Sequence, residues 1–265
     1  MSVMTVTYLS HYLKRYVDFR VILPVEDTHD LKPLPEEITP FKTLYLLHGF
    51  SGSSSDWLYG SRIFKIARDL KLAVVMPSGE NHFYVDQPET DMMYCSYVGQ
   101  ELVDMTRKLF PLSRRREDTF IGGLSMGGIG SLLVGSRFAE NFGGIISLSG
   151  PLAINASTRS LLAAPQGFLT AHFGPEEEFA TSLNNPLYTA ALAQKSGTLP
   201  PIYVAVGTED FILDSCENGV KELKGMGADV TFVKEKGAHD WVFWDYHIEK
   251  GIHWYLDEVS ANGKG

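Results

Sequence analysis

The segment Gly123-Leu124-Ser125-Met126-Gly127 has the residue types and spacing most able to do chemistry. The apolar run Thr119–Leu124 leads directly into it, and a helical pattern begins at Met126. This context is typical of a nucleophile elbow, a sharp strand-to-helix turn that lifts a serine hydroxyl above a sheet. A glycine-rich turn with an incidental serine is the alternative, so the interpretation depends on finding the serine's partners.

A serine nucleophile needs a base, and the base needs an acid to orient it. The apolar run Pro201–Val206 ends in Gly207-Thr208-Glu209-Asp210-Phe211. We predict Asp210 as the acid because it follows the carboxyl end of a strand, where open α/β sheets place ligand-facing groups. Glu209, expected to face the other way, and Asp214, expected inside the next helix, are the competitors. A helix N-cap is the alternative role for Asp210.

His239 is the predicted base. It follows the strand-like run Val230–Glu235 and lies in Gly237-Ala238-His239-Asp240-Trp241, so the chain order is Ser, acid, His, as in α/β-hydrolases. A loop at this place would let the imidazole reach Ser125 while Asp210 holds its Nδ1–H. The other histidines fit less well: His11 and His29 precede the core sheet, His82 and His172 are expected in loops, and His247 and His253 lie on the last helix.

An oxyanion intermediate also needs two backbone N–H donors. The residue after the nucleophile, Met126, supplies one. The apolar run Thr43–Leu47 ends in His48-Gly49-Phe50, and this turn predicts the amide of Phe50 as the second donor, with Gly49 as the alternative. We expect His48 to be a buried, hydrogen-bonded support for this loop rather than an acid or base.

Strand and helix patterns alternate along the chain, which predicts an α/β-hydrolase fold: one mostly parallel central sheet with helices on both faces. An antiparallel pair, Val3–Tyr8 and Tyr16–Leu23, and a proline- and acid-rich loop, Pro24–Phe41, come first. The expected strands are Thr43–Leu47, Leu72–Met76, Thr119–Leu124 and Gly144–Leu148; the expected helices are Trp57–Leu70, Tyr97–Phe110 and Met126–Phe138; and two further strand–helix units end the chain. Residues 1–265 are predicted to form a single domain.

The segment 150–199 interrupts this alternation. Long insertions at the strand ends of such folds commonly form lids or pocket walls, so we predict a small helical cap over Ser125. A surface subdomain without substrate contact is the alternative.

Several motifs, taken together, resemble the esterase D group of α/β-hydrolases, most closely its tributyrin esterase and feruloyl esterase-like branch. They are Leu47–Gly52, Gly123–Gly128, Gly207–Phe211 and Gly237–Trp241, and the resemblance runs from Val6 to Tyr255. It implies a cofactor-free serine carboxylesterase that hydrolyses short-chain or aryl acyl esters through an acyl-enzyme. By matching position it implies the triad Ser125, Asp210 and His239, with oxyanion donors Phe50 and Met126.

The resemblance also suggests substrate contacts. The loop Glu80–Met93, with Tyr84 and Asp86, corresponds to a loop near the acyl site, although its aromatic residues could equally pack beneath the cap. We expect Gly49, Tyr84, Asp86 and Trp241 to contact substrate. The S-formylglutathione hydrolase branch typically has a cysteine where Gly52 stands, so a thioesterase is an alternative; an acyltransferase with the same triad, a lipase and a non-catalytic binding module are others.

Composition narrows the classes of partner. The formal net charge of −9 would repel nucleic acid and anionic membranes. No apolar run is long enough to span a bilayer. Cys95 and Cys216 form no metal or redox motif, which favours a reduced, cytoplasmic chain without a metal. The expected partner is a small-molecule ester substrate, and a homo-oligomer is possible.

Overall fold

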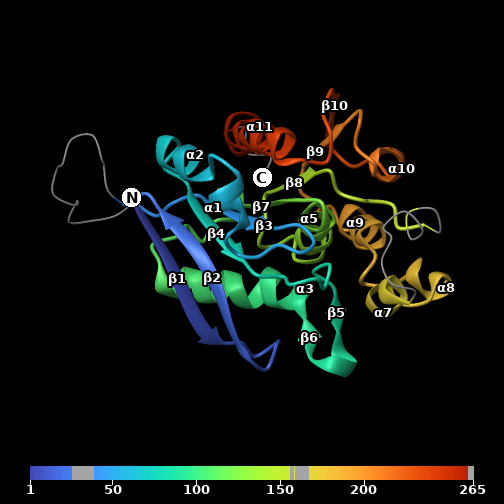
Figure 1. Cartoon of the computed structure of the whole chain (residues 1–265), viewed down its shortest axis with the longest axis horizontal. Coiled ribbons are helices and arrows are strands. Elements are labelled where there is room, and N and C mark those ends of the chain that lie inside the picture. The colour runs from blue at the N-terminus through green and yellow to red at the C-terminus, as the bar shows by residue number, and fades with distance from the viewer. Residues whose placement is uncertain (26–38, 156–157, 159–166, 262–265) are drawn as a thin grey trace.

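The computed structural model describes the chain except for residues 26–38, 156–157, 159–166 and 262–265. Its centre is an eight-stranded sheet in the order β1-β2-β4-β3-β7-β8-β9-β10 (Figure 1). The strands are β1 Ser2–Leu9, β2 Tyr16–Leu23, β3 Thr43–Leu47, β4 Ala73–Pro77, β7 Thr119–Leu124, β8 Gly144–Leu148, β9 Ile202–Gly207 and β10 Val230–Glu235.

The sheet is parallel from β4 to β10, and β1 and β2 add an antiparallel pair at one edge. Parallel strands with both faces covered are apolar along their whole length, and every residue of β3, β4, β7, β8 and β9 is buried. Parallel strands also end at one edge of the sheet, so the loops after β3, β7, β9 and β10 meet there. The predicted α/β-hydrolase architecture is confirmed.

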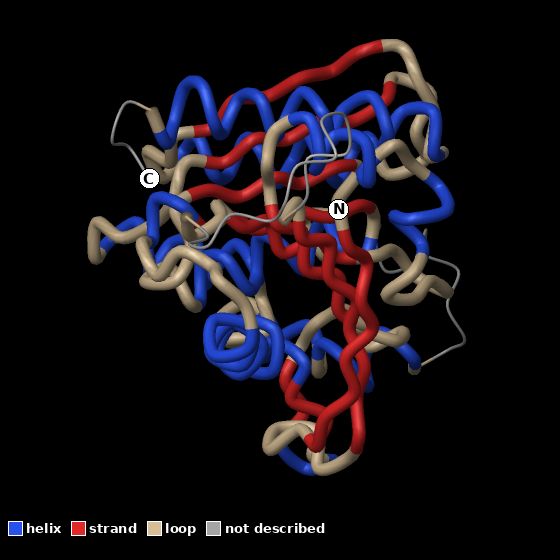
Figure 2. The backbone as a smooth tube through the Cα atoms, turned by 90° about the vertical axis from the view of Figure 1, so that its left-hand side faces the viewer, coloured by secondary structure: helices blue, strands red, loops and turns tan. Residues whose placement is uncertain are grey.

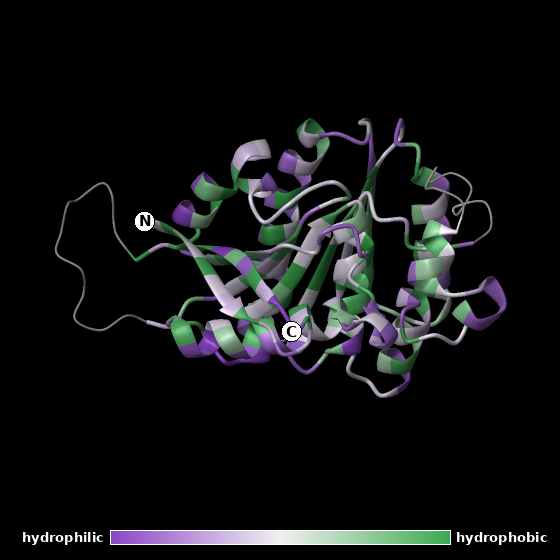
Figure 3. Ribbon diagram, turned by 60° about the horizontal axis from the view of Figure 1, so that its bottom comes forward, coloured by the Kyte–Doolittle hydropathy of each residue, from purple (hydrophilic) through white to green (hydrophobic). Residues whose placement is uncertain are grey.

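Helices cover both faces of the twisted sheet (Figure 2). One face carries α1 Asp56–Gly60, α2 Ile63–Asp69 and α11 Trp241–His253; the other carries α3 Tyr94–Ser96, α4 Leu102–Leu109, α5 Met126–Arg137, α9 Pro186–Lys195 and α10 Leu213–Gly225. Alternate strand residues serve the two layers: Leu44 and Leu46 pack with the first, Tyr45 and Leu47 with the second. Hydrophobic residues accordingly follow the central strands and hydrophilic ones the outer helix turns (Figure 3).

Two expected helices and one residue expected in a loop differ from the structure. The segment Trp57–Leu70 forms two helices, α1 and α2, separated at Ser61 and Arg62. The helix expected over Tyr97–Phe110 starts earlier, at α3, and contains a π-helical stretch, Tyr97–Glu101, before α4. His172, expected in a loop, lies in the helix α7 Phe168–Phe173.

The structure describes the two long expected loops to different extents. Most of the expected loop Pro24–Phe41 lies outside the described residues. The expected loop Glu80–Met93 contains a two-stranded ribbon, β5 Asp86–Gln87 and β6 Met92–Met93, joined by the 3-10 turn Pro88–Thr90.

The insertion 150–199 has two differently placed parts. Its helix α9 belongs to the main body, since it packs along α5 and Thr189 shares a hydrogen bond of 2.8 Å with Ser136. The short helix α7 lies beside the β5–β6 ribbon, and α8 Glu176–Phe179 packs on α7 (Figure 1). Gln87 donates to the carbonyl of Ala171, and Asn184 exchanges two hydrogen bonds with the backbone of Asp86. Among the described residues of the insertion, the α7–α8 part is therefore the one that the main body leaves available as a cap.

Candidate active site

Ser125 occupies a strained turn between β7 and α5, with φ 52° and ψ −115°. Few non-glycine residues adopt such angles, and they cluster at functional sites. The neighbouring glycines make the turn possible. A Cβ on Gly123 would collide with the carbonyl of Gly127, and a Cβ on Gly127 would collide with the carbonyls of Leu47 and His48. The glycines of the motif thus let strand, helix and the loop after β3 meet at the serine.

Ser125, His239 and Asp210 form a continuous hydrogen-bonded chain. His239 Nε2 lies 2.9 Å from Ser125 Oγ, and its Nδ1 lies 2.9 and 3.0 Å from the two carboxylate oxygens of Asp210. The Asp210 side chain is fully buried, whereas the imidazole is 17% exposed. The arrangement can move a proton from the serine hydroxyl to the imidazole, with the carboxylate fixing the tautomer. The three side chains follow three different strands, β7, β9 and β10, which end at the same edge of the sheet.

The competing acids lie elsewhere. Glu209 is exposed, and Asp214 is inside the first turn of α10, as expected. Asp210 is not the N-cap of α10, a position that Ile212 takes; its Oδ1 nevertheless accepts the amide of Ile212 at 3.0 Å. This local bond holds the carboxylate while it faces the imidazole.

The loop after β3 lies against the elbow. A Cβ on Gly49 would lie 3.5 Å from Ser125 Cβ and would crowd Leu124. The two amides that follow Phe50 have partners, since Ser51 donates to Asn81 at 2.7 Å and Gly52 donates to the carbonyl of Gly49 at 3.1 Å. Met126 begins α5, where a helix supplies no acceptor for the first N–H groups. The helix dipole also favours a negative charge at this end.

His48 supports this loop from inside. Its Nδ1–H donates to the carbonyl of Gly49 at 2.7 Å, and Nε2 accepts the amide of Gly79 at 2.8 Å. The side chain is buried, and burial lowers the pKa of His48 below that of a free histidine. The imidazole is therefore neutral, because protonation would replace the acceptor for Gly79 with a second donor.

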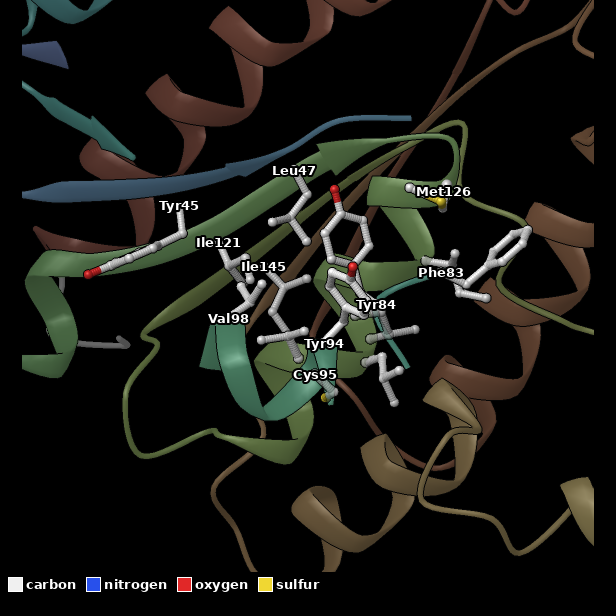
Figure 4. Close-up of a cluster of buried hydrophobic side chains, with 14 of the residues drawn as sticks. Tyr45, Leu47, Phe83, Tyr84, Tyr94, Cys95, Val98, Ile121, Met126 and Ile145 are labelled. Carbon is white, nitrogen blue, oxygen red and sulfur yellow. The ribbon is translucent and has the colours of Figure 1, made fainter. Parts of the chain in front are cut away.

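Tyr84 and Asp86, two of the expected substrate contacts, are buried. Tyr84 is fully buried in the core between β3 and α5, and its hydroxyl donates to the carbonyl of His48 at 3.1 Å (Figure 4). The Asp86 carboxylate is also buried; it accepts the amide and hydroxyl of Ser96 and pairs with Arg137 at 2.8 Å. Neither side chain is open to a substrate. Both side chains instead attach the segment that contains β5 to the core.

Phe83, next to Tyr84, packs against the loop after β3. Its ring packs on Phe50 of the loop after β3 at 5.9 Å and on Phe168 of α7 at 6.2 Å, and Phe50 and Phe168 contact each other edge-to-face at 5.8 Å. Phe83 and Tyr84 both have positive φ, 50° and 57°, so their directions follow from a strained turn. We call Phe50, Phe83 and Phe168 the aromatic wall; it joins the loop after β3 to α7.

Aromatic side chains also surround His239. Phe211 lies 4.5 Å from the imidazole and Trp244 lies 4.9 Å from it, between ring centroids. Trp241 packs edge-to-face on both Trp244 and Trp57, which fixes the start of α11 against α1. Sequence reasoning did not single out Phe211 or Trp244. Adjacency to Asp210 was the only signal for Phe211, and Trp244 had none beyond its place on a helix.

Comparisons with known proteins agree with this geometry. Residues 10–254 match the family described as Putative esterase. An acetyl esterase of Caldicellulosiruptor saccharolyticus is 37% identical to this chain over an alignment of 271 residues. The alignment covers 98% of this chain and all of the relative. Two Staphylococcus aureus structures, each 26% identical and covering 97% of this chain and 99% of the other, superpose with TM-scores of 0.86 and 0.83: the substrate-bound fluorophosphonate-binding serine hydrolase FphF and the S-formylglutathione hydrolase FrmB.

The fold and site define a serine hydrolase of the α/β-hydrolase class. The chain belongs to the esterase family, in its esterase D-like group, and is a carboxylic ester hydrolase. Within the described residues, no helix is long and apolar enough to cross a membrane.

Proposed function

We propose that this esterase hydrolyses short-chain acyl esters through an acyl-enzyme on Ser125. The observation that carries the proposal is the hydrogen-bonded chain from Ser125 Oγ through His239 to the buried carboxylate of Asp210. His239 accepts the serine proton during attack and returns it to the leaving alcohol, while Asp210 stabilises the imidazolium. Water then attacks the acyl-enzyme by the same proton route.

We assign the amides of Phe50 and Met126 as the donors to the oxyanion. Two observations support the assignment: Gly49 brings the loop against Ser125, and Met126 lies at the N-terminus of α5. Preorganised backbone donors typically contribute about 3 kcal/mol each to the stabilisation of such a transition state. Gly49 and Trp241 remain proposed substrate neighbours. Gly49 would contact substrate through its backbone, and Trp241 through the indole that packs beside α1.

The aromatic wall supports a preference for short acyl groups. Rings held against one another cannot move aside for a long alkyl chain, and Phe83 is buried while Phe168 is anchored on His172 at 4.3 Å. Each methylene that fits contributes about 0.8 kcal/mol through burial. Each one that does not fit costs ~1–3 kcal/mol in strain. Efficiency should therefore rise with chain length and then fall, with the maximum near butyryl.

A thioester substrate is the second candidate, because the FrmB structure is similar to this one. The position of Gly52 argues against it. A Cβ there would collide with the Asp56 carboxylate and would lie 2.9 Å from His48 Nδ1, so a cysteine at this place would require Asp56 to move. The loop is thus fitted to glycine.

The test is a comparison of kcat/KM for p-nitrophenyl acetate, butyrate, octanoate and decanoate, methyl ferulate, and S-formylglutathione. We expect a maximum at butyrate or acetate and a steep fall at octanoate. A monotonic rise through decanoate would mean an open groove and a lipase. S-Formylglutathione as the best substrate by tenfold or more would replace the ester proposal with the thioesterase.

Other features stay predictions. Both cysteines are free and buried, which is compatible with the expected cytoplasmic location but does not test it. Three further expectations from the sequence also stay predictions: a single domain with a cap, a possible homo-oligomer, and the lack of a nucleic-acid partner.

A further inference from the structure

Phe211 combines two properties that rarely occur together. Its ring lies against the imidazole of His239, at 4.5 Å and an interplanar angle of 53°, yet the residue is 53% exposed. Its neighbour in the chain, Asp210, is buried. A large apolar side chain beside the catalytic imidazole gains free energy when a ligand covers it and removes it from water. Because Phe211 contacts the catalytic imidazole, its exposed surface lies where a bound ester would cover it.

The second ring that contacts His239, that of Trp244, is buried. Trp244 is only 7% exposed, and its indole N–H donates to Ser149 Oγ at 3.0 Å. Among the described residues, no ring contact joins Phe211 to Trp244, although each lies within 5 Å of the imidazole. The two rings therefore contact different parts of His239. Trp244 is the fixed, buried support, and Phe211 is the side open to substrate.

The chemistry decides which part of the substrate lies there. During acylation, His239 Nε2 must give its proton to the oxygen of the leaving alcohol, so that oxygen is in contact with the imidazole. The substituent on the oxygen then extends over the accessible surface beside the ring. The aromatic wall of Phe50, Phe83 and Phe168 is part of a separate cluster, and no ring contact links it to Phe211 among the described residues.

We propose that the exposed face of Phe211 binds the alcohol portion of the ester and favours aromatic alcohols over small alkyl ones. The inference rests on the proposed acyl-enzyme mechanism and adds an alcohol subsite to it. By microscopic reversibility, the same surface binds an aromatic alcohol that attacks the acyl-enzyme. In that step the alcohol oxygen bonds to the acyl carbon and His239 accepts the hydroxyl proton. The bond from the acyl carbon to Ser125 Oγ then breaks, and the proton passes to Oγ.

The first experiment compares benzyl acetate with methyl acetate, two esters with the same acyl group and leaving alcohols of similar acidity. The variants are Phe211→Ala and Phe211→Leu, with Leu109→Ala as the control, because Leu109 is 51% exposed at the end of α4, away from the site. We expect Phe211→Ala to lower kcat/KM for benzyl acetate about tenfold, the size of an aromatic contact plus its buried area, and for methyl acetate less than about twofold. For benzyl acetate, kcat/KM of Phe211→Leu should lie between that of wild type and that of Phe211→Ala.

The second experiment measures how the acetyl-enzyme partitions between benzyl alcohol and methanol, present together with p-nitrophenyl acetate as donor. The ratio of benzyl acetate to methyl acetate formed is an internal comparison, so the fraction of folded enzyme and the orientation of His239 cancel. We expect Phe211→Ala to lower this ratio about tenfold and Leu109→Ala to leave it unchanged.

Two outcomes would overturn the alcohol subsite. Equal losses on both acetates with an unchanged partition ratio would make Phe211 a residue that positions His239. No change on either ester would mean that substrate does not touch Phe211. Failure of the wild-type enzyme to hydrolyse any acetate would instead contradict the proposed function itself.

Discussion

Gly207 at the end of β9 and Gly237 in the loop after β10 pack so closely that no Cβ fits on Gly207, because it would collide with the carbonyl of Gly237. The same carbonyl accepts the amide of Glu209 at 2.9 Å, and Thr208 donates to Glu235 at 2.8 Å. The loop that carries Asp210 is therefore bonded through its backbone to the loop that carries His239. The distance between acid and base is set by main-chain contacts.

Gly207→Ala should separate these loops. A backbone carbonyl cannot swing away like a side chain, so we expect a loss of about 1–3 kcal/mol in the free energy of unfolding. A displacement of about 1 Å between catalytic groups can lower kcat by about a hundredfold. Gly225→Ala is the matched control. Open space surrounds that glycine at the end of α10, so its variant should keep wild-type activity and be as stable as wild type or more stable by up to about 1 kcal/mol. Urea unfolding and kcat on p-nitrophenyl acetate measure both; equal activity of the two variants would contradict the prediction.

Ser125→Ala should abolish turnover and leave the fold intact. The members of a triad act as a unit, so the loss in kcat should be on the order of 10⁴–10⁶, and His239→Ala should behave similarly. Circular dichroism and urea unfolding establish that the variants are folded. Retention of a tenth of the wild-type rate, after contaminating esterase is excluded, would remove Ser125 as the nucleophile.

Asp210→Asn should lower kcat by about 10⁴ with little change in KM, because the amide cannot stabilise the imidazolium or hold the same tautomer. Asp214→Asn and Glu209→Gln are the controls from the same loop and helix, and we expect each to stay within about twofold to threefold of wild type, as usual for exposed sites. If either control were the more damaging change, the acid would have to be reassigned.

Phe168→Ala should open the aromatic wall, because Phe168 is the member of the wall that α7 supplies. We expect the acyl-chain optimum to move from butyrate toward hexanoate or octanoate, while butyrate loses the contacts of one ring, about 0.5–1.5 kcal/mol. The control is Leu192→Ala in the same insertion, on the outer side of α9, where the residue is 44% exposed. An unchanged p-nitrophenyl ester profile would show that acyl chains do not reach α7.

His48 should make stability depend on pH. Burial lowers its pKa in the folded state below the free value of about 6.5, so between the two pKa values the unfolded chain binds more protons. The free energy of unfolding then rises with pH, and the contribution of His48 is lost as the pH falls below about 6.5. Urea unfolding at pH 7.5 and 5.5 should show a larger loss for wild type than for His48→Gln, since the carboxylates common to both cancel. A larger loss in the variant would reverse the assigned sign.

Phe83 and Tyr84 show where sequence reasoning fails. Their neighbourhood was predicted to contact substrate, but Tyr84 and Asp86 point into the core and Phe83 faces the aromatic wall. In a regular strand the alternation of side chains would have assigned the faces. Two consecutive residues with positive φ break that alternation, and the sequence carries no local signal for such angles in Phe or Tyr.

The sequence by itself determined the strands and the order of the site. The bounds of β3, β7 and β8 were predicted as observed, because continuous apolar runs between turn residues depend only on neighbours in the chain. The chain order of Ser125, Asp210 and His239 followed from motifs at strand ends.

Only the tertiary structure decided which side chains touch. The contacts of His239 with Phe211 and Trp244, and of Phe50 with Phe168, join segments from different loops and helices. Their positions depend on how the sheet brings those loops to one edge and on backbone contacts such as that of Gly207 with Gly237. Local pattern cannot encode these distances, because they result from packing between elements remote in the chain.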